Sequence, residues 1–168
     1  RFQMFHDKQK VVSPMSSFTD NAGRTWTLSV TFGSIRRVRD LVGVNLARME
    51  DGDPPLLTQL GTDVVLLCDV IFALIKPQAD DRSISDEEWA EAMGGEAILN
   101  AHNAFYEALQ DFFRSAGRPD VVTAARKQKT MIDLAVRAGQ EKLDRIDPQT
   151  QVKSIYGDSG TSSEGSAG

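Results

Sequence analysis

Residues 17–32 read SFTDNAGRTWTLSVTF, and this stretch decides how the fold begins. Residues 20–23 are the kinds of residue that favour tight turns. After them, residues 24–32 alternate between apolar side chains and the small polar side chains of Thr and Ser. Period two in β-branched and aromatic residues is typical of a half-buried strand. The stretch therefore predicts a β-hairpin whose second strand extends to Phe32.

A short helix is predicted directly after the hairpin, over residues 33–42. Its apolar residues fall on one stripe, arginines take the opposite side, and Gly43 provides the usual helix end. Residues 44–46 are a candidate third strand. In the loop that follows, Asp53 and Pro54 suit the start of a helix, as an N-cap residue followed by proline.

The remainder of the ordered chain is predicted to be helical. Residues 63–76 form a helix that Thr62 caps and Pro77 stops, and 11 of the 12 residues from 64 to 75 are apolar. A helix that is apolar almost all round belongs in the centre of a fold. After a polar loop over residues 78–83, Ser85 and Glu88 fit a capping box. Further helices are predicted over residues 96–115 and 119–145.

These elements predict an α+β fold. A small N-terminal antiparallel hairpin with a short helix is followed by a mainly α-helical bundle and a disordered C-terminal tail. The predicted organisation is an extended arm or edge strand over residues 1–15, a compact domain over 16–118, a long and weakly anchored helix over 119–146, and a Gly/Ser-rich tail over 147–168. The tail prediction rests on composition, because nine of its 22 residues are Gly or Ser.

Composition and charge exclude several classes of protein. The chain has 168 residues, one cysteine and two histidines, which leaves no disulfide framework and no paired metal spacing. The net charge of -5 argues against a dedicated nucleic-acid binder. Residues 1–50 carry a net charge of +4 and residues 51–118 carry -9, so self-association through opposed surfaces is an expectation. The longest apolar stretch is too short to span a bilayer, and the protein is expected in the cytoplasm.

No residue pattern predicts catalysis, a cofactor or a metal. Helix–loop–helix residues 77–88 fail the calcium-loop register, because Pro77 and Ala79 would occupy ligand positions. His102 lies on an apolar stripe beside Phe105 and is interpreted as a structural histidine, and Cys68 as a small core residue. The chain is therefore predicted not to be an enzyme.

Four short motifs resemble a known group of proteins. They are Phe18-Thr19-Asp20 with Gly23-Arg24-Thr25-Trp26, Gly43-Val44-Asn45-Leu46, Ile84-Ser85 with Glu88-Trp89, and Asp111-Phe112-Phe113. Over residues 16–115 the chain resembles the tail assembly chaperone-like proteins of long-tailed bacteriophages and prophages, which are encoded near the tape measure protein. The chain departs from that pattern at Asn45, where an acidic residue is expected.

The resemblance implies a non-enzymatic assembly factor in the bacterial host cytoplasm. It would bind the phage tape measure protein, or another tail protein, and keep it soluble until the tail tube polymerises around it. The residues expected to contact the partner lie on the last helix and in the tail: Val121, Ala125, Ile132, Ala135, Val152, Ile155 and Tyr156. The alternatives are a structural virion component, such as a connector or tail-completion protein, and a small nucleic-acid-binding regulator that uses Arg36, Arg37 and Arg39.

Overall fold

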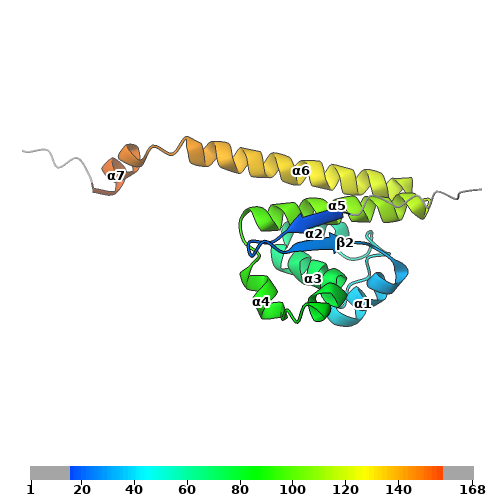
Figure 1. Ribbon diagram of the computed structural model, residues 1–168. Helices are drawn as coiled ribbons and strands as arrows, with labels where there is room; N and C mark the ends of the chain where they lie inside the picture. The colour runs from blue at the N-terminus through cyan, green and yellow to red at the C-terminus, as the bar shows by residue number, and fades with distance from the viewer. Residues whose placement is uncertain (1–15, 157–168) are drawn as a thin grey trace, which may run out of the picture. The chain divides into compact units, whose positions relative to one another are not determined.

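The structure, a computed structural model, describes residues 16–156, so the predicted arm over residues 1–15 and the tail residues 157–168 lie outside the described part. Within residues 16–156, two strands and seven helices follow one another (Figure 1): β1 (Ser16–Thr19), β2 (Thr25–Leu28), α1 (Phe32–Val42), α2 (Leu56–Thr62), α3 (Val64–Asp81), α4 (Asp86–Glu91), α5 (Glu96–Ser115), α6 (Pro119–Asp144) and α7 (Pro148–Tyr156). This is the predicted α+β fold. The chain divides after Thr130 into two compact units, and the division falls inside α6.

The predicted hairpin is present as an antiparallel pair with Phe18 opposite Trp26. Both side chains are buried, and the hairpin packs on α5 and α3. The second strand is shorter than predicted and ends at Leu28. Thr31 and Ser34 form a capping box that begins α1 at Phe32, whose side chain is 75% exposed instead of lying on a strand face. The cap therefore stops the strand, although the alternation in the sequence continues.

A buried carboxylate, Asp20, organises the hairpin turn. Its Oδ1 accepts the backbone N–H groups of Ala22 and Arg24, both at 3.0 Å. Its Oδ2 accepts Trp26 Nε1 and Arg24 Nε, both at 2.8 Å. Burial raises the pKa of Asp20, but the hydrogen bonds from Trp26 and Arg24 together hold it below its ordinary value. The same arginine reaches Glu88 of α4 at 2.9 Å, so the turn is joined to the helical part of the first unit.

The apolar helix α3 forms the centre of the first unit, as predicted, but it does not stop at Pro77. Proline has no N–H to donate to the carbonyl four residues earlier, which is that of Ala73. Arg37 of α1 donates to the carbonyls of Ala73 and Leu74, both at 3.2 Å, and so supplies a donor for the carbonyl that Pro77 leaves without its helical bond. The helix continues to Asp81, and part of the predicted loop over residues 78–83 is helical.

The extra turn of α3 brings Gln78 against the outer edge of β2. Gln78 Nε2 donates to the Thr27 carbonyl at 2.7 Å, and Gln78 Oε1 accepts the Thr27 N–H at 3.0 Å. Just after the helix, Arg82 donates to the Thr25 carbonyl at 2.9 Å and its guanidinium lies 4.5 Å from the centre of the Trp26 ring. These side chains act in place of a third strand along this edge.

Several local predictions are corrected by the structure. Within residues 16–156 the sheet has two strands, so residues 44–46 do not form a third. Asp63, not Thr62, caps α3, because its carboxylate accepts the N–H groups of Val65 and Leu66. Helix α2 begins after Pro55, so Asp53 and Pro54 do not start it. The predicted cap at Ser85, the helix over residues 96–115 and the αL helix end at Gly43 are confirmed.

The second unit contains the rest of α6 from Met131 and the helix α7. Helix α7 corrects the predicted tail, because residues 148–156 are helical and not disordered. Asp147 caps this helix by accepting the Gln149 N–H and the Thr150 hydroxyl, both at 3.0 Å, and Pro148 suits the first helical position. The Gly and Ser residues behind the prediction lie beyond Tyr156, except for Ser154.

We predict that Asp20→Asn lowers the free energy of unfolding by about 2–4 kcal/mol, because an amide cannot accept all four hydrogen bonds. The ionised carboxylate is the stabilising form, since the pKa of Asp20 is lower in the folded state. The difference between wild type and variant should therefore be complete above about pH 5 and shrink as the pH falls through the folded-state pKa. Urea unfolding from pH 7 down to acid measures it. Asp40→Asn, on the surface, should change stability by less than about 0.5 kcal/mol.

We predict that Gln78→Ala costs about 1–3 kcal/mol of stability, because the backbone groups of Thr27 lose both partners. Thermal or urea unfolding of the variant measures the loss. The matched control is Gln140→Ala on the exposed surface of α6, which should stay within about 0.5 kcal/mol of wild type. Equal effects at the two positions would contradict a role for Gln78 at the strand edge.

Candidate functional site

The predicted partner-contact residues fall into two groups. Val121 and Ala125 are buried in the first unit, so the chain's own core uses them and they are not available on its surface. The side-chain amide of Gln128 also lies against Gly61 of α2, which anchors the first turns of α6. In the second unit, Ala135, Val152 and Ile155 are exposed, Ile132 is half-buried, and Tyr156 is the last residue of α7. The prediction of partner contact thus remains open for the second unit alone.

The second unit exposes more large apolar side chains than the prediction included. Leu143 is 62% exposed and Ile155 is 71% exposed. The further exposed members are Met131, Leu134, Val136, Ile146 and Val152. At 100° per residue, the apolar side chains of α6 from Met131 to Leu143 cover an arc of about 200°. We call these residues the α6 apolar face: Met131, Ile132, Leu134, Ala135, Val136, Ala138 and Leu143.

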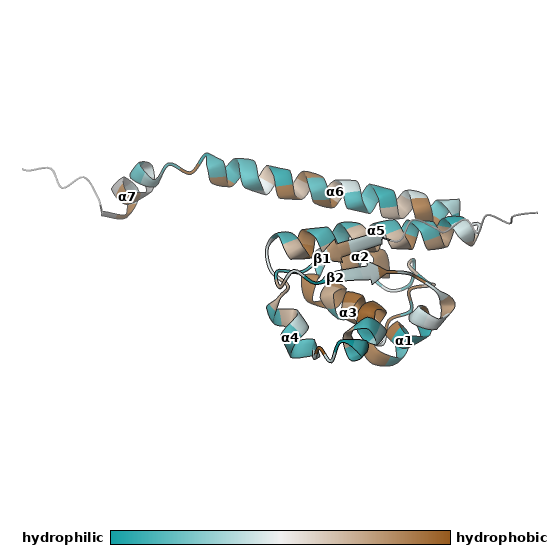
Figure 2. Cartoon of the chain, in the orientation of Figure 1, coloured by the Kyte–Doolittle hydropathy of each residue, from teal (hydrophilic) through white to brown (hydrophobic). Residues whose placement is uncertain are grey.

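Charged side chains of α6 occupy the remaining arc. From residue 131 to residue 144, Lys142 is the one charged residue within the apolar arc. The others fall together on the opposite side of the helical projection: Asp133, Arg137, Glu141 and Asp144. Figure 2 shows α3 hydrophobic along most of its length, whereas α6 alternates between hydrophobic and hydrophilic residues. This pattern is that of an amphipathic helix, and in the second unit its apolar side is exposed. This amphipathic pattern is hard to recognise in the sequence, because apolar residues spread over a wide arc do not recur at a regular three- or four-residue spacing.

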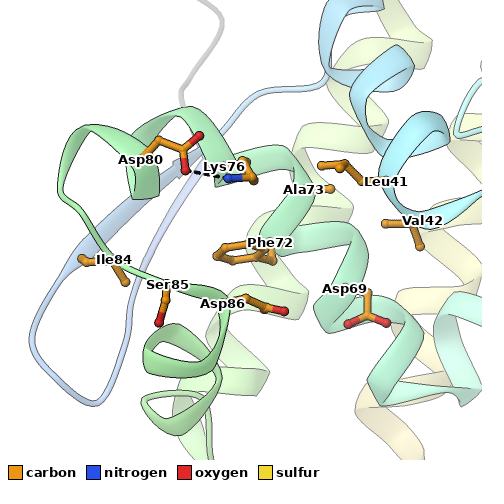
Figure 3. A pocket seen from close by; sticks show the side chains of 10 residues that line it. All are labelled: Leu41, Val42, Asp69, Phe72, Ala73, Lys76, Asp80, Ile84, Ser85 and Asp86. Atoms are coloured by element: carbon orange, nitrogen blue, oxygen red, sulfur yellow. Dashed lines mark hydrogen bonds and ion pairs between the residues drawn. The ribbon is translucent and has the colours of Figure 1, made fainter.

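A hollow of about 560 Å³ lies in the first unit between α1, α3 and the segment that leads into α4 (Figure 3). We call it the acidic groove, and its lining residues are Leu41, Val42, Asp69, Phe72, Ala73, Lys76, Asp80, Ile84, Ser85 and Asp86. In Figure 3 the Phe72 ring lies between the Lys76–Asp80 pair and the carboxylates of Asp69 and Asp86. The sequence had indicated only a solvated loop and a helix cap here.

The groove carries an excess of negative charge. Lys76 Nζ is 2.6 Å from Asp80 Oδ1, so the lysine in the lining is already paired. Burial raises the pKa of Asp69, and the carboxylates of Asp86 and Asp63 raise it further. Burial and Asp69 together also raise the pKa of the neighbouring Cys68 thiol, which disfavours the reactive thiolate.

Among the described residues of the first 50 positions, most arginines are engaged by separate contacts. Arg24 pairs with Asp20 and Glu88, Arg48 pairs with Asp51, and Arg37 is engaged by carbonyls of α3. Arg39 lies 3.5 Å from Asp40, both on the surface. For a nucleic-acid-binding regulator to use Arg36, Arg37 and Arg39 together, Arg37 would have to break its hydrogen bonds to the α3 carbonyls.

His102 is buried, as the sequence predicted, and its ring centroid is 4.7 Å from that of Tyr106. Burial raises the pKa of Tyr106 to about 12, so this phenol stays protonated at neutral pH. Within residues 16–156 no three His, Cys, Asp or Glu residues are grouped closely enough to hold a metal ion.

No protein-family model, no curated protein and no solved structure matches this chain. Among the described helices, none is by itself both long and apolar enough to cross a membrane, and only the pair α2 and α3, bent by 105°, meets that measure together.

We predict that two valine-to-alanine changes in the same helix have different costs. Val121 is 6% exposed and Val136 is 45% exposed. Val121→Ala should lower the free energy of unfolding by about 1–2 kcal/mol, because it removes buried methyl groups. Val136→Ala should change it by less than about 0.5 kcal/mol. Urea unfolding of both variants gives the comparison, and an equal loss at Val136 would show that its face is already covered within the folded chain.

Proposed function

We propose that the chain is a non-enzymatic phage tail assembly factor that binds the tape measure protein and keeps it soluble in the host cytoplasm during tail assembly. The observation that supports the proposal is the exposed α6 apolar face, together with Val152 and Ile155 of α7. The resemblance in residues 16–115 names the partner, and the face supplies a surface suited to it.

Exposed leucine and methionine side chains favour a partner that covers them. Fully burying one such side chain contributes about 1.5–3 kcal/mol, and α6 offers Met131, Leu134 and Leu143 in under four turns. An extended helical chain with its own apolar stripe is a complementary partner, because two amphipathic helices bury both stripes when they pack. Such a contact would shield the partner's apolar side chains from aggregation.

The first unit has a different part in this proposal. It packs its own core around α3 and holds the start of α6 through Val121, Val122 and Ala125. The helix is thereby nucleated, which offsets the cost of forming its first turn in isolation. The apolar residues of the second unit then lie on the continuation of a helix that the first unit has nucleated.

The test is co-expression of the chain with the tape measure protein encoded beside it. Wild-type chain should increase the soluble yield of that protein and co-purify with it. Leu134→Ser with Leu143→Ser should reduce the co-purified amount by about tenfold or more, because two anchoring side chains lose their apolar contact. The matched control is Val65→Ser with Leu99→Ser, which changes two exposed apolar residues of the first unit and should leave co-purification within about twofold of wild type.

Equal losses in both double variants, or no gain in soluble tape measure protein with wild type, would contradict the proposal. Mass spectrometry of purified particles separates the alternative. An assembly factor should be absent from mature virions, whereas a connector or tail-completion protein would be present at a fixed copy number.

A further inference from the structure

We propose that the acidic groove of the first unit is a second binding surface, which takes a lysine or arginine side chain from a basic amphipathic segment of a partner protein. This surface is formed entirely by α1, α3 and residues 84–86, the last of which is the first residue of α4. It shares no residue with the α6 apolar face. The inference therefore does not depend on the identity of the protein that the α6 face binds.

The shape of the groove suits a long side chain with an apolar stem. Phe72 and Ala73 of α3 line one side, Leu41 and Val42 of α1 line another, and Ile84 lines a third. Lys and Arg place their methylene stems along apolar surfaces while their charged heads reach polar groups. The Phe72 ring is held by Trp89, with ring centroids 5.4 Å apart, so this wall is part of the packed core.

The charges of the groove decide the sign of the occupant. No ion pair within residues 16–156 involves Asp69 or Asp86, whereas Asp80 is paired with Lys76. The carboxylates of Asp86 and Asp63 also act on Asp69, since both raise its pKa. A cationic head at the Asp69 and Asp86 end would relieve this repulsion, and an anionic one would add to it.

The space around the groove has room for the residues that flank such a cation. A second, more open hollow of about 640 Å³ shares Leu41, Lys76 and Asp80 with it and continues past Gly33 and Arg36. A peptide segment can therefore extend from the groove over α1 and the end of α3. This extension favours a peptide over a free small cation, because residues next to the charged one can make further contacts, including with Leu41 and Pro77.

The experiment is an NMR titration of the isotope-labelled full chain with a synthetic amphipathic peptide of leucine and lysine, about four helical turns long. A peptide of the same pattern with glutamate in place of lysine is the charge control. The lysine peptide should shift the amide signals of Asp69, Phe72, Ile84 and Asp86, and its effect there should weaken as salt is raised. The glutamate peptide should leave these signals in place.

Two pairs of variants then distinguish specific binding in the groove from a non-specific effect of the protein's net charge. Asp69→Asn with Asp86→Asn should weaken the groove affinity by about tenfold or more, whereas Glu107→Gln with Glu141→Gln removes the same charge elsewhere and should change it by less than about twofold. The first pair should fold, because neutralising Asp69 relieves repulsion, and circular dichroism verifies this for both pairs.

Shifts confined to residues 131–156, or equal weakening by the two variant pairs, would overturn the groove proposal. Neither result would bear on the tape measure test, which depends on Leu134 and Leu143. Failure of that test would likewise leave the groove titration intact.

Discussion

The rest of the first unit depends on the hydrogen bonds that the buried carboxylate of Asp20 accepts. A charged group without exposure is tolerated only when its oxygens are fully hydrogen-bonded, and Asp20 receives four donors. These bonds close the turn, orient Trp26 into the core and hold Arg24 toward Glu88 of α4. Next to it, Asn21 donates from its backbone to Ala92 and from its side chain to Gly94, so the turn is also tied to the α4–α5 junction.

The requirement that buried polar groups be hydrogen-bonded also explains how the hairpin packs against α3. A two-stranded sheet has a free edge, and a proline in a helix leaves a free carbonyl; both are costly when buried. Gln78 covers part of the edge of β2 and Arg37 serves the carbonyl near Pro77. The proline therefore does not end α3. The extra helical turn after it positions Gln78 at the edge of β2 and Asp80 at the acidic groove.

Local signals predicted much of the fold but only part of the candidate sites. The hairpin, the α1 helix end at Gly43, the Ser85 cap and the α5 helix follow from residues close in sequence, and all are present. Val121, Ala125 and Ile132 were all expected to contact the partner, yet Val121 and Ala125 lie in the core. The helical period predicts which residues lie on the same face of a helix. It does not predict which turns of that face pack against the core of the first unit. The acidic groove was missed because α1, which is distant in sequence from α3 and α4, supplies the apolar side chains that enclose it.

The sequence by itself determined the class of fold and the central place of α3. These depend on hydrophobic period, capping residues and turn residues, which act over a few positions. Only the tertiary structure decided where β2 ends, that α3 passes through Pro77, that residues 148–156 are helical, and which apolar residues of α6 stay exposed. The physical reason is that a side chain such as Arg37 or Gln78 satisfies backbone groups about 36 to 51 positions away, and no local pattern records that pairing.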